Sequence, residues 1–234
     1  NIAIPSSVKY IASGTFCGCN SLSSIVLPDD LEQISSYTFS CCSNLNSVKL
    51  PAKLASIGQG AFETCIGLSA IEIPCSVTEI DNMAFKGCKS LISVSMVPGL
   101  HKICSQAFMD CISLKNIAMP QGLIVLEDNV FNGCINLSDV KLNNELETIG
   151  TSCFFHCPAL NGIDIPPSVN VIGEYAFSYT RLSRMAVSWA IPPVVNDNIF
   201  KYTDIGGIEL IVPAESLNGY LGISPWNKLN IIAE

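Results

Sequence analysis

Hydrophobic positions recur along this chain with one fixed step. Phe returns every 23 residues, and Phe155 is the single Phe outside the series. Cys follows each column Phe by three residues, Leu by six, a β-branched residue by nine, and Leu, Ile or Met by eleven, until these columns drift after Phe177. The Phe column comprises Phe16, Phe39, Phe62, Phe85, Phe108, Phe131, Phe154, Phe177 and Phe200.

One unit reads F-x-x-C-x-x-L-x-x-I-x-L-P-x-x-L-x-x-I-x-x-x-A. Alternation in its I-x-L part predicts a strand. The following Pro predicts the strand's end, because Pro cannot donate to a ladder. The A-F-x-x-C part predicts a helical or tight turn on the opposite side. A unit this short cannot bury its apolar face alone, so we expect stacked units whose columns pack on themselves.

Two other repeat architectures were weighed against this pattern. Helical repeats need about 33 to 47 residues per unit. A pectinase-type β-helix is possible, but a single Leu-rich strand segment per unit favours a leucine-rich repeat. The expected fold class is therefore an α/β solenoid, a right-handed superhelix of 23-residue leucine-rich repeats. It has a parallel sheet on one wall and short helical turns or irregular coil on the other.

The unit resembles the BspA-like class of leucine-rich repeats. Residues 61–80, AFETCIGLSAIEIPCSVTEI, show the pattern almost completely, and the resemblance covers about residues 1–187. The tail, with Val212-Pro213, Tyr220, Trp226 and Ile231-Ile232, is similar to the usual end of such arrays. The resemblance implies a surface or secreted protein of a host-associated bacterium or a parasitic protist. It implies binding of host proteins or other surface partners, and no reaction.

One domain is expected, with two parts. Residues 1–187 form the repeat array, which starts in the middle of a unit, and residues 188–234 form an irregular last repeat and a C-terminal cap. The start in mid-unit indicates a fragment of a longer chain. We expect an extracellular or cell-surface location, with a signal peptide or lipoprotein anchor already removed.

Composition narrows the possible partners. Charged residues make up only 14% of the 234 residues, and the net charge is −8. Nucleic-acid binding is not expected, because it needs a basic surface that displaces counterions from phosphates. No apolar run approaches the length of a membrane-spanning helix, so no membrane insertion of this segment is expected. Partners would be proteins, possibly host extracellular or surface proteins, or a glycan.

The 12 cysteines suggest a disulfide framework at first. Seven of them share one column, however, so their side chains run parallel, whereas a disulfide needs converging Cβ vectors. We expect a ladder of reduced, buried thiols that pack as small hydrophobes. Cys153, His156 and Cys157 have a spacing reminiscent of a metal site, but a ladder cysteine should point inward. No metal or cofactor is expected.

Outward strand positions lie eight and ten residues after each Phe and carry mostly small side chains. Lys141 beside Asp164 would form an exposed ion pair of little energetic weight. Asp139 and Asp164 could approach the roughly 5 to 9.5 Å of a glycosidase carboxylate pair, although no third polar group joins them. The possible partner-binding strand face comprises Ser47, Lys49, Glu72, Ser93, Ser95, Asn116, Asp139, Lys141 and Asp164.

The chain is therefore predicted to be a non-enzymatic protein-binding module for adhesion or partner interaction, with no catalytic residue. A structural spacer for another domain and a β-helix-type carbohydrate-active enzyme are the alternatives. A second candidate surface carries tyrosines, of which Tyr37 and Tyr175 share a column two residues before Phe. These tyrosines, all expected to be exposed, are Tyr10, Tyr37, Tyr175, Tyr179 and Tyr202.

Overall fold

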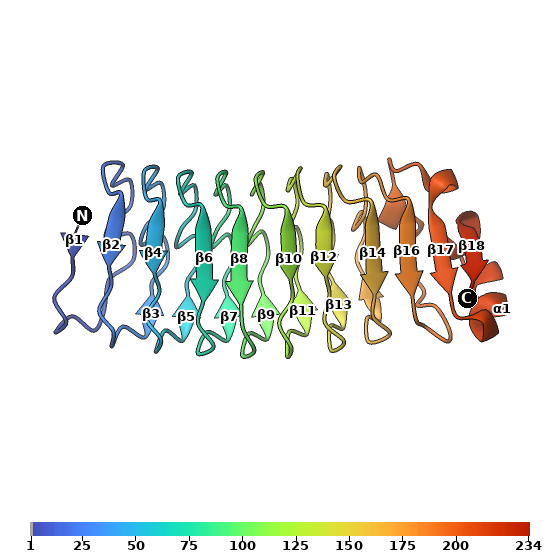
Figure 1. Ribbon diagram of the computed structural model, residues 1–234, viewed down its shortest axis with the longest axis horizontal. Helices are drawn as coiled ribbons and strands as arrows, with labels where there is room; N and C mark the ends of the chain where they lie inside the picture. Colours follow the sequence, from blue (N-terminus) through green and yellow to red (C-terminus); the bar gives the residue numbers. More distant parts are fainter. Residues whose placement is uncertain (1) are drawn as a thin grey trace.

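The protein is an elongated stack of coils, seen in a computed structural model that describes residues 2–234 (Figure 1). Each coil contributes one strand to a broad wall of parallel strands, and partner residues lie one repeat apart, as in Ile25↔Val48. The predicted solenoid is thus confirmed. The broad wall comprises β1 (Ile2–Ala3), β2 (Ser24–Val26), β4 (Ser47–Lys49), β6 (Ala70–Ile73), β8 (Ser93–Met96), β10 (Asn116–Ala118), β12 (Asp139–Lys141), β14 (Gly162–Ile165), β16 (Arg184–Val187), β17 (Glu209–Val212) and β18 (Asn230–Ala233).

A second, narrow sheet runs along the stack. Each coil from β2 to β14 adds one short strand to it, directly after its strand in the broad wall. Its seven two-residue strands form one continuous parallel ladder, with register such as Ile57↔Ile80. The repeat pattern predicts one strand per unit and not this second sheet, because a strand of two residues shows no hydrophobic alternation. The narrow sheet comprises β3 (Gln33–Ile34), β5 (Ser56–Ile57), β7 (Glu79–Ile80), β9 (Lys102–Ile103), β11 (Val125–Leu126), β13 (Thr148–Ile149) and β15 (Val171–Ile172).

Tight turns around the Phe column form the third side of each coil, in the place where a helical or tight turn was predicted. The backbone N–H of Phe39 donates to the carbonyl of Ala61 in the next coil at 2.8 Å, and that of Cys41 donates to Glu63 at 2.7 Å. The N–H between them, that of Ser40, instead donates within its own coil to Tyr37 at 3.2 Å. Successive N–H groups therefore alternate between bonds along the stack and bonds within the coil.

This alternation coincides with left-handed backbone two residues before and two residues after each Phe from Phe16 to Phe177, and only after Phe200 in the last turn. Glycine occupies some of these places, such as Gly87 at φ +70°. Other side chains pay a steric penalty there, because Cβ crowds the carbonyl oxygen. The non-glycine residues with positive φ all fall at these two places: Tyr37, Cys41, Thr64, Met83, Gln106, Asp110, Asn129, Ser152, His156, Tyr175, Tyr179 and Tyr202.

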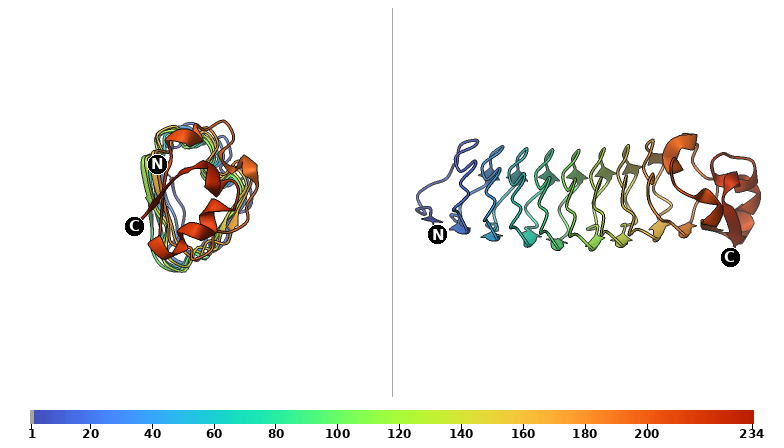
Figure 2. Two further views of the ribbon diagram at one scale, coloured as in Figure 1. Left: turned by 90° about the vertical axis from the view of Figure 1, so that its right-hand side faces the viewer. Right: turned by 90° about the horizontal axis from the view of Figure 1, so that it is seen from above.

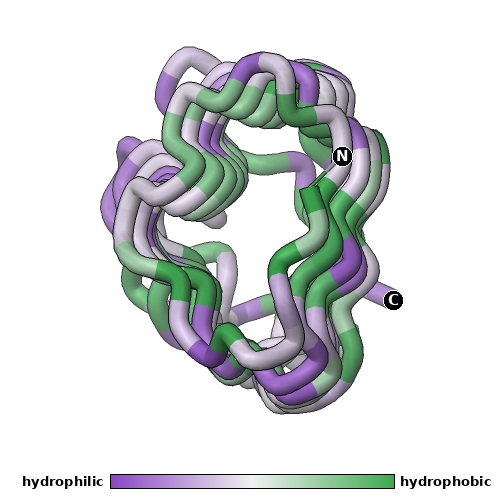
Figure 3. Tube along the Cα trace, turned by 90° about the vertical axis from the view of Figure 1, so that its left-hand side faces the viewer, coloured by the Kyte–Doolittle hydropathy of each residue, from purple (hydrophilic) through white to green (hydrophobic). Residues whose placement is uncertain are grey.

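The interior is built from columns of identical side chains. Neighbouring Phe rings stack along the whole series, with centroids 5.3 Å apart between Phe85 and Phe108. Beside them, each ladder thiol from Cys42 to Cys157 donates to the Phe carbonyl one coil back, as Cys111 Sγ does to Phe85 at 3.2 Å. Where the column changes to Thr, the Thr203 hydroxyl makes the same bond to the Phe177 carbonyl at 2.8 Å. Looking along the axis, the coils superimpose with apolar and polar positions in register (Figure 3).

Short helical elements gather at the C-terminal end of the stack (Figure 2). Trp226 and Tyr220 are fully buried there, and Trp226 Nε1 donates to the carbonyl of Pro193 at 2.9 Å. None of the helices found within residues 2–234 has the length and apolar character needed to cross a bilayer. The elements are η1 (Asp197–Phe200), η2 (Ile205–Gly207), η3 (Ala214–Ser216), α1 (Leu217–Leu221) and η4 (Trp226–Lys228).

Removing one ring from the Phe column should lower the free energy of unfolding substantially. Phe108 is fully buried between Phe85 and Phe131. Phe108→Ala should therefore cost about 3–5 kcal/mol in chemical denaturation. The control is Ser95→Ala on the outward strand face, which should change stability by less than about 0.5 kcal/mol. Equal effects would contradict the assignment of the column to the interior.

Thiol labelling should separate the cysteines into two groups. Burial raises the pKa of Cys88 to about 12 and that of Cys111 well above its usual range, so neither supplies thiolate near neutrality. All twelve thiols are free, and those of Cys17, Cys41 and Cys75 are exposed. Brief iodoacetamide treatment of the native protein, read by mass spectrometry, should modify these three first. Rapid labelling of Cys88 or Cys111 would contradict the buried ladder.

Replacing a strained residue with glycine should stabilise the turn wall. Thr64 is β-branched and exposed at φ +58°, where a branched side chain is least tolerated. Thr64→Gly should raise the free energy of unfolding by roughly 0.5–1 kcal/mol. Thr78→Gly, at an exposed position outside the left-handed places, should lower it by roughly 0.5–1 kcal/mol instead. A loss of stability in both variants would rule out relief of strain at Thr64.

Candidate functional site

The outward positions of the broad wall lie where the sequence predicted them. Register places Ser24 beside Ser47, Glu72 beside Ser95, and Asn116 beside Asp139. Alternate residues of each strand point inward, so the outward ones form two continuous columns along the stack. All nine residues predicted for the partner-binding face are exposed, namely Ser47, Lys49, Glu72, Ser93, Ser95, Asn116, Asp139, Lys141 and Asp164.

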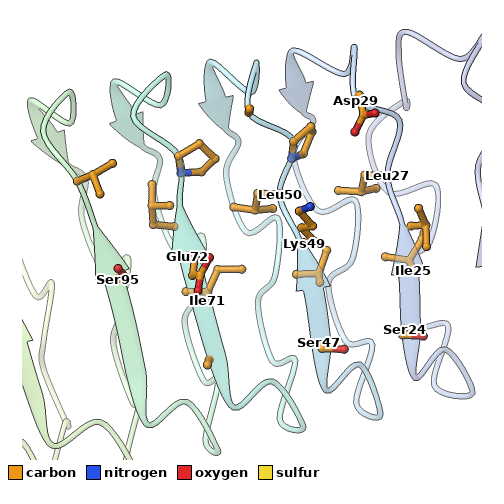
Figure 4. A pocket seen from close by; sticks show the side chains of 18 residues that line it. Ser24, Ile25, Leu27, Asp29, Ser47, Lys49, Leu50, Ile71, Glu72 and Ser95 are labelled. Atoms are coloured by element: carbon orange, nitrogen blue, oxygen red, sulfur yellow. The ribbon is translucent and has the colours of Figure 1, made fainter.

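A groove of about 920 Å³ lies on this face over β2, β4, β6 and the end of β8 (Figure 4). Its lining mixes apolar and charged side chains. Val26, which is 66% exposed, and Val97 supply apolar surface, while Asp29, Lys49 and Glu72 supply charge. A surface of this kind offers a partner both apolar contact and groups that fix its orientation.

The groove lies across a break in the broad wall. β4 and β6 belong to different hydrogen-bonded sheets, whereas β2–β4 and β6–β8 are paired. Pro51 and Pro74 follow the inward Leu50 and Ile73 at the ends of the strands beside the break. The sequence predicted the outward columns but not the groove. In the described chain, pairing is also absent between β8 and β10 and between β12 and β14, so a break alone does not make a groove.

Charge on the groove is available to a partner. Among the described residues, neither Lys49 nor Glu72 forms an ion pair. Next to the groove-lining Asp29, Asp30 does have a partner, because Lys53 Nζ lies 2.6 Å from its Oδ1. The hydrogen bond and the charge of Lys53 lower the pKa of Asp30. That pair is fully exposed and is weak as a stabilising contact.

The predicted ion pair between Lys141 and Asp164 is replaced by another. Asp164 Oδ1 instead accepts a hydrogen bond from Arg184 Nη1 at 2.5 Å. Arg184 was missed because Leu182 comes one residue early after Phe177, which moves Arg184 into the outward column beside Gly162, although Phe200 still follows at the full step. If the strand positions are counted from Leu182 instead of from Phe177, Arg184 falls in the outward column.

One of the two carboxylates considered for acid–base chemistry has another partner, and the residues considered for metal binding do not form a metal-holding group in the described chain. Asp164 is engaged by Arg184, and no contact joins it to Asp139 within the described chain. Cys153 and Cys157 are buried while His156 is exposed and lies edge-on to Tyr179. Residues 2–234 contain no group of three or more His, Cys, Asp or Glu arranged to hold a metal ion.

A charged cluster on the narrow sheet was not singled out by the sequence. Lys102 Nζ lies 2.7 Å from Glu127 Oε1 and 3.8 Å from Glu79 Oε1. Cys104 Sγ also donates to Glu79, at 2.8 Å. The hydrogen bond that Lys102 donates to Glu127 raises the pKa of Lys102. These side chains bond to one another across three coils. The charges of the cluster are therefore already paired along the narrow sheet and are not available to a partner.

The tyrosines differ in exposure from what the sequence predicted. Tyr10, Tyr179 and Tyr202 are exposed, but Tyr37 and Tyr175 are half-buried. Tyr37 lies against Gly60, where an added Cβ would come within 2.4 Å of the ring. Tyr37 thus packs on the turn of the next coil, while Tyr10 lies between β1 and β2, many coils away from Tyr179 and Tyr202.

Comparison with known proteins agrees with this geometry. The model of the BspA type leucine-rich repeat region matches residues 1–115 and 78–206. A leucine-rich repeat protein from Bacteroides ovatus is 24% identical over 90% of this chain and 63% of its own, with a TM-score of 0.71. The leucine-rich repeat protein of T. pallidum is 32% identical over 68% of this chain and 77% of its own, with a TM-score of 0.62.

A leucine-rich repeat protein from Eubacterium ventriosum is 27% identical over 68% of this chain and 43% of its own, with a TM-score of 0.63. The chain therefore spans less than two thirds of the Bacteroides and Eubacterium proteins. No curated protein matches it. The family match covers most of the repeats, and its unit is the one that builds the Phe, Cys and strand columns described above. This chain belongs to the BspA-type leucine-rich repeat family.

Proposed function

We propose that this chain is a non-enzymatic protein-binding module that holds its partner on the outward strand face, over the groove at β2 to β8. The observation that carries the proposal is the groove itself, where exposed Val26 lies beside the unpaired charges of Lys49 and Glu72. A repeat solenoid presents such a face as an extended surface, which suits a protein partner.

Small side chains on the same face support the proposal. Ser47, Ser93 and Ser95 project little from the strands, so a partner's backbone can approach closely. Lys49 and Glu72 then supply opposite charges for orientation, and complementary charges set specificity and association rate more than affinity. A partner protein that fills the groove would cover Val26 and remove its exposed apolar surface from water.

We place the module outside the cell, at the surface or secreted, in a role in adhesion or partner interaction. The resemblance to BspA-like repeats supports this location. Host extracellular or surface proteins are the partners that the resemblance implies. Three alternatives to this proposal remain for the experiment to test: the chain binds a glycan, it is a structural spacer, or it is a carbohydrate-active enzyme.

The test is selection from a random displayed peptide library on the immobilised protein, followed by affinity measurement for the enriched peptides. Ser47→Arg and Ser95→Arg place a bulky cation in the groove and should weaken binding by about tenfold or more. Ser90→Arg introduces the same side chain at an exposed position outside the groove and should leave affinity unchanged.

Peptides that bind all three variants equally would overturn the assignment of the strand face. Failure to enrich any peptide would favour a spacer. Hydrolysis of a polysaccharide panel that is abolished by Asp139→Asn would replace the proposal with a carbohydrate-active enzyme.

A further inference from the structure

Three tyrosines and a lysine gather on the turn wall of the last coils, away from the groove. We call Tyr175, Tyr179, Lys201 and Tyr202 the tyrosine–lysine cluster. The rings of Tyr179 and Tyr202 stack at 4.8 Å with 20° between their planes. They are nevertheless 43% and 62% exposed. This is therefore an aromatic surface facing water rather than part of the interior.

A cation lies among these rings. Lys201 Nζ is 5.6 Å from the ring centroid of Tyr175 and 5.3 Å from that of Tyr202, within cation–π range. No carboxylate in the described part of the chain forms an ion pair with Lys201. Although the chain has a net charge of −8, the Lys201 ammonium is a positive charge with no carboxylate bound to it in the described residues.

The fold does not need tyrosine at these places. Tyr179 and Tyr202 occupy the left-handed position two residues after Phe, at φ +56° and +65°. The equivalent residue is Gly18, Gly87 or Gly133 in three earlier coils, and Cys41, Thr64, Asp110 or His156 in the other four. The place therefore takes side chains of several kinds, and Tyr179 and Tyr202 differ from the others by stacking as exposed aromatic rings. The turn alone does not explain why bulky aromatic side chains stand in a strained column.

Hydrogen-bonding capacity indicates what the cluster would bind. Among residues 2–234, the hydroxyls of Tyr175, Tyr179 and Tyr202 have no protein partner, unlike that of Tyr220, which donates to Trp189. With the Lys201 ammonium, the cluster offers several donors around one positive charge. Beside Lys201 and Tyr202 lies a hollow of about 230 Å³, bordered also by Lys228 and Asp197, which pair with each other at 2.8 Å and leave Lys201 as its unpaired charge among the described residues. Acceptors with negative charge complement such a surface.

We propose that the tyrosine–lysine cluster is a second docking surface, which binds an acidic segment of a partner protein. Lys201 pairs with a carboxylate of that segment, and the tyrosine hydroxyls donate to its carboxylates and backbone carbonyls. Tyrosine is enriched among the residues that dominate protein interfaces, which favours a protein over other acidic polymers. The surface is separate from the strand-face groove and does not depend on it.

The experiment compares two peptide arrays. In one array, half of the positions are Asp or Glu and the rest are random; in the other, Asn and Gln replace them. The protein should retain acidic peptides preferentially, and added salt should weaken that preference. The Lys201→Gln/Tyr202→Phe variant should lose about tenfold in affinity for the retained peptides.

Two controls match the changed residues. Lys89→Gln removes an exposed cation elsewhere on the turn wall, and Tyr10→Phe changes a tyrosine that is 64% exposed and lies in the first repeat. Both should bind acidic peptides as the unchanged protein does, and so should Ser95→Arg, which tests only the groove. Equal retention of both arrays, or a preference that survives in Lys201→Gln/Tyr202→Phe, would overturn the proposal. Retention of polygalacturonate instead of acidic peptides would replace it with an acidic glycan.

Discussion

Every coil of this protein depends on a surface that belongs to the next coil. A Phe ring is covered on each face by the same ring one repeat away, and its backbone N–H is satisfied by a carbonyl of the following coil. Because the neighbour provides both the packing and the hydrogen bond, a residue type that fits one level must fit all levels. This requirement fixes the repeat length, the column composition and the straight axis of the stack.

That requirement also explains what could be read from the sequence. The Phe and Cys columns, the broad-wall strands and the exposure of all nine outward residues follow directly from the repeat. The narrow sheet does not, because strands such as Thr148–Ile149 are too short to show a period. The groove over β2 to β8 does not follow from the repeat either, and the Arg184–Asp164 pair depends on a one-residue shift. Local departures from the period were the part that pattern reasoning missed.

The three sides of a coil have different freedom to change. Interior columns keep buried side chains, and where the ladder cysteines give way to Thr the hydroxyl still donates to a Phe carbonyl, from Thr203 one coil back and from Thr180 within its own coil. Outward strand positions bear little on stability, so Ser, Lys, Glu and Asp can vary there, and the proposed partner site lies among them. The turn wall is intermediate, since its left-handed places favour glycine and yet carry tyrosine in the last coils. Variation concentrated on two walls would let one solenoid engage two partners at once.

The hydrogen bonds that run from each coil to the next have a consequence for inheritance. Contacts reach only adjacent levels, so copying or losing a complete unit at the genetic level would leave every remaining level with the neighbour it requires. Unequal recombination between such tandem segments would alter the reach of the molecule while leaving its cross-section intact. A lineage carrying this gene could thus adjust how far its binding surfaces stand apart without evolving a new fold.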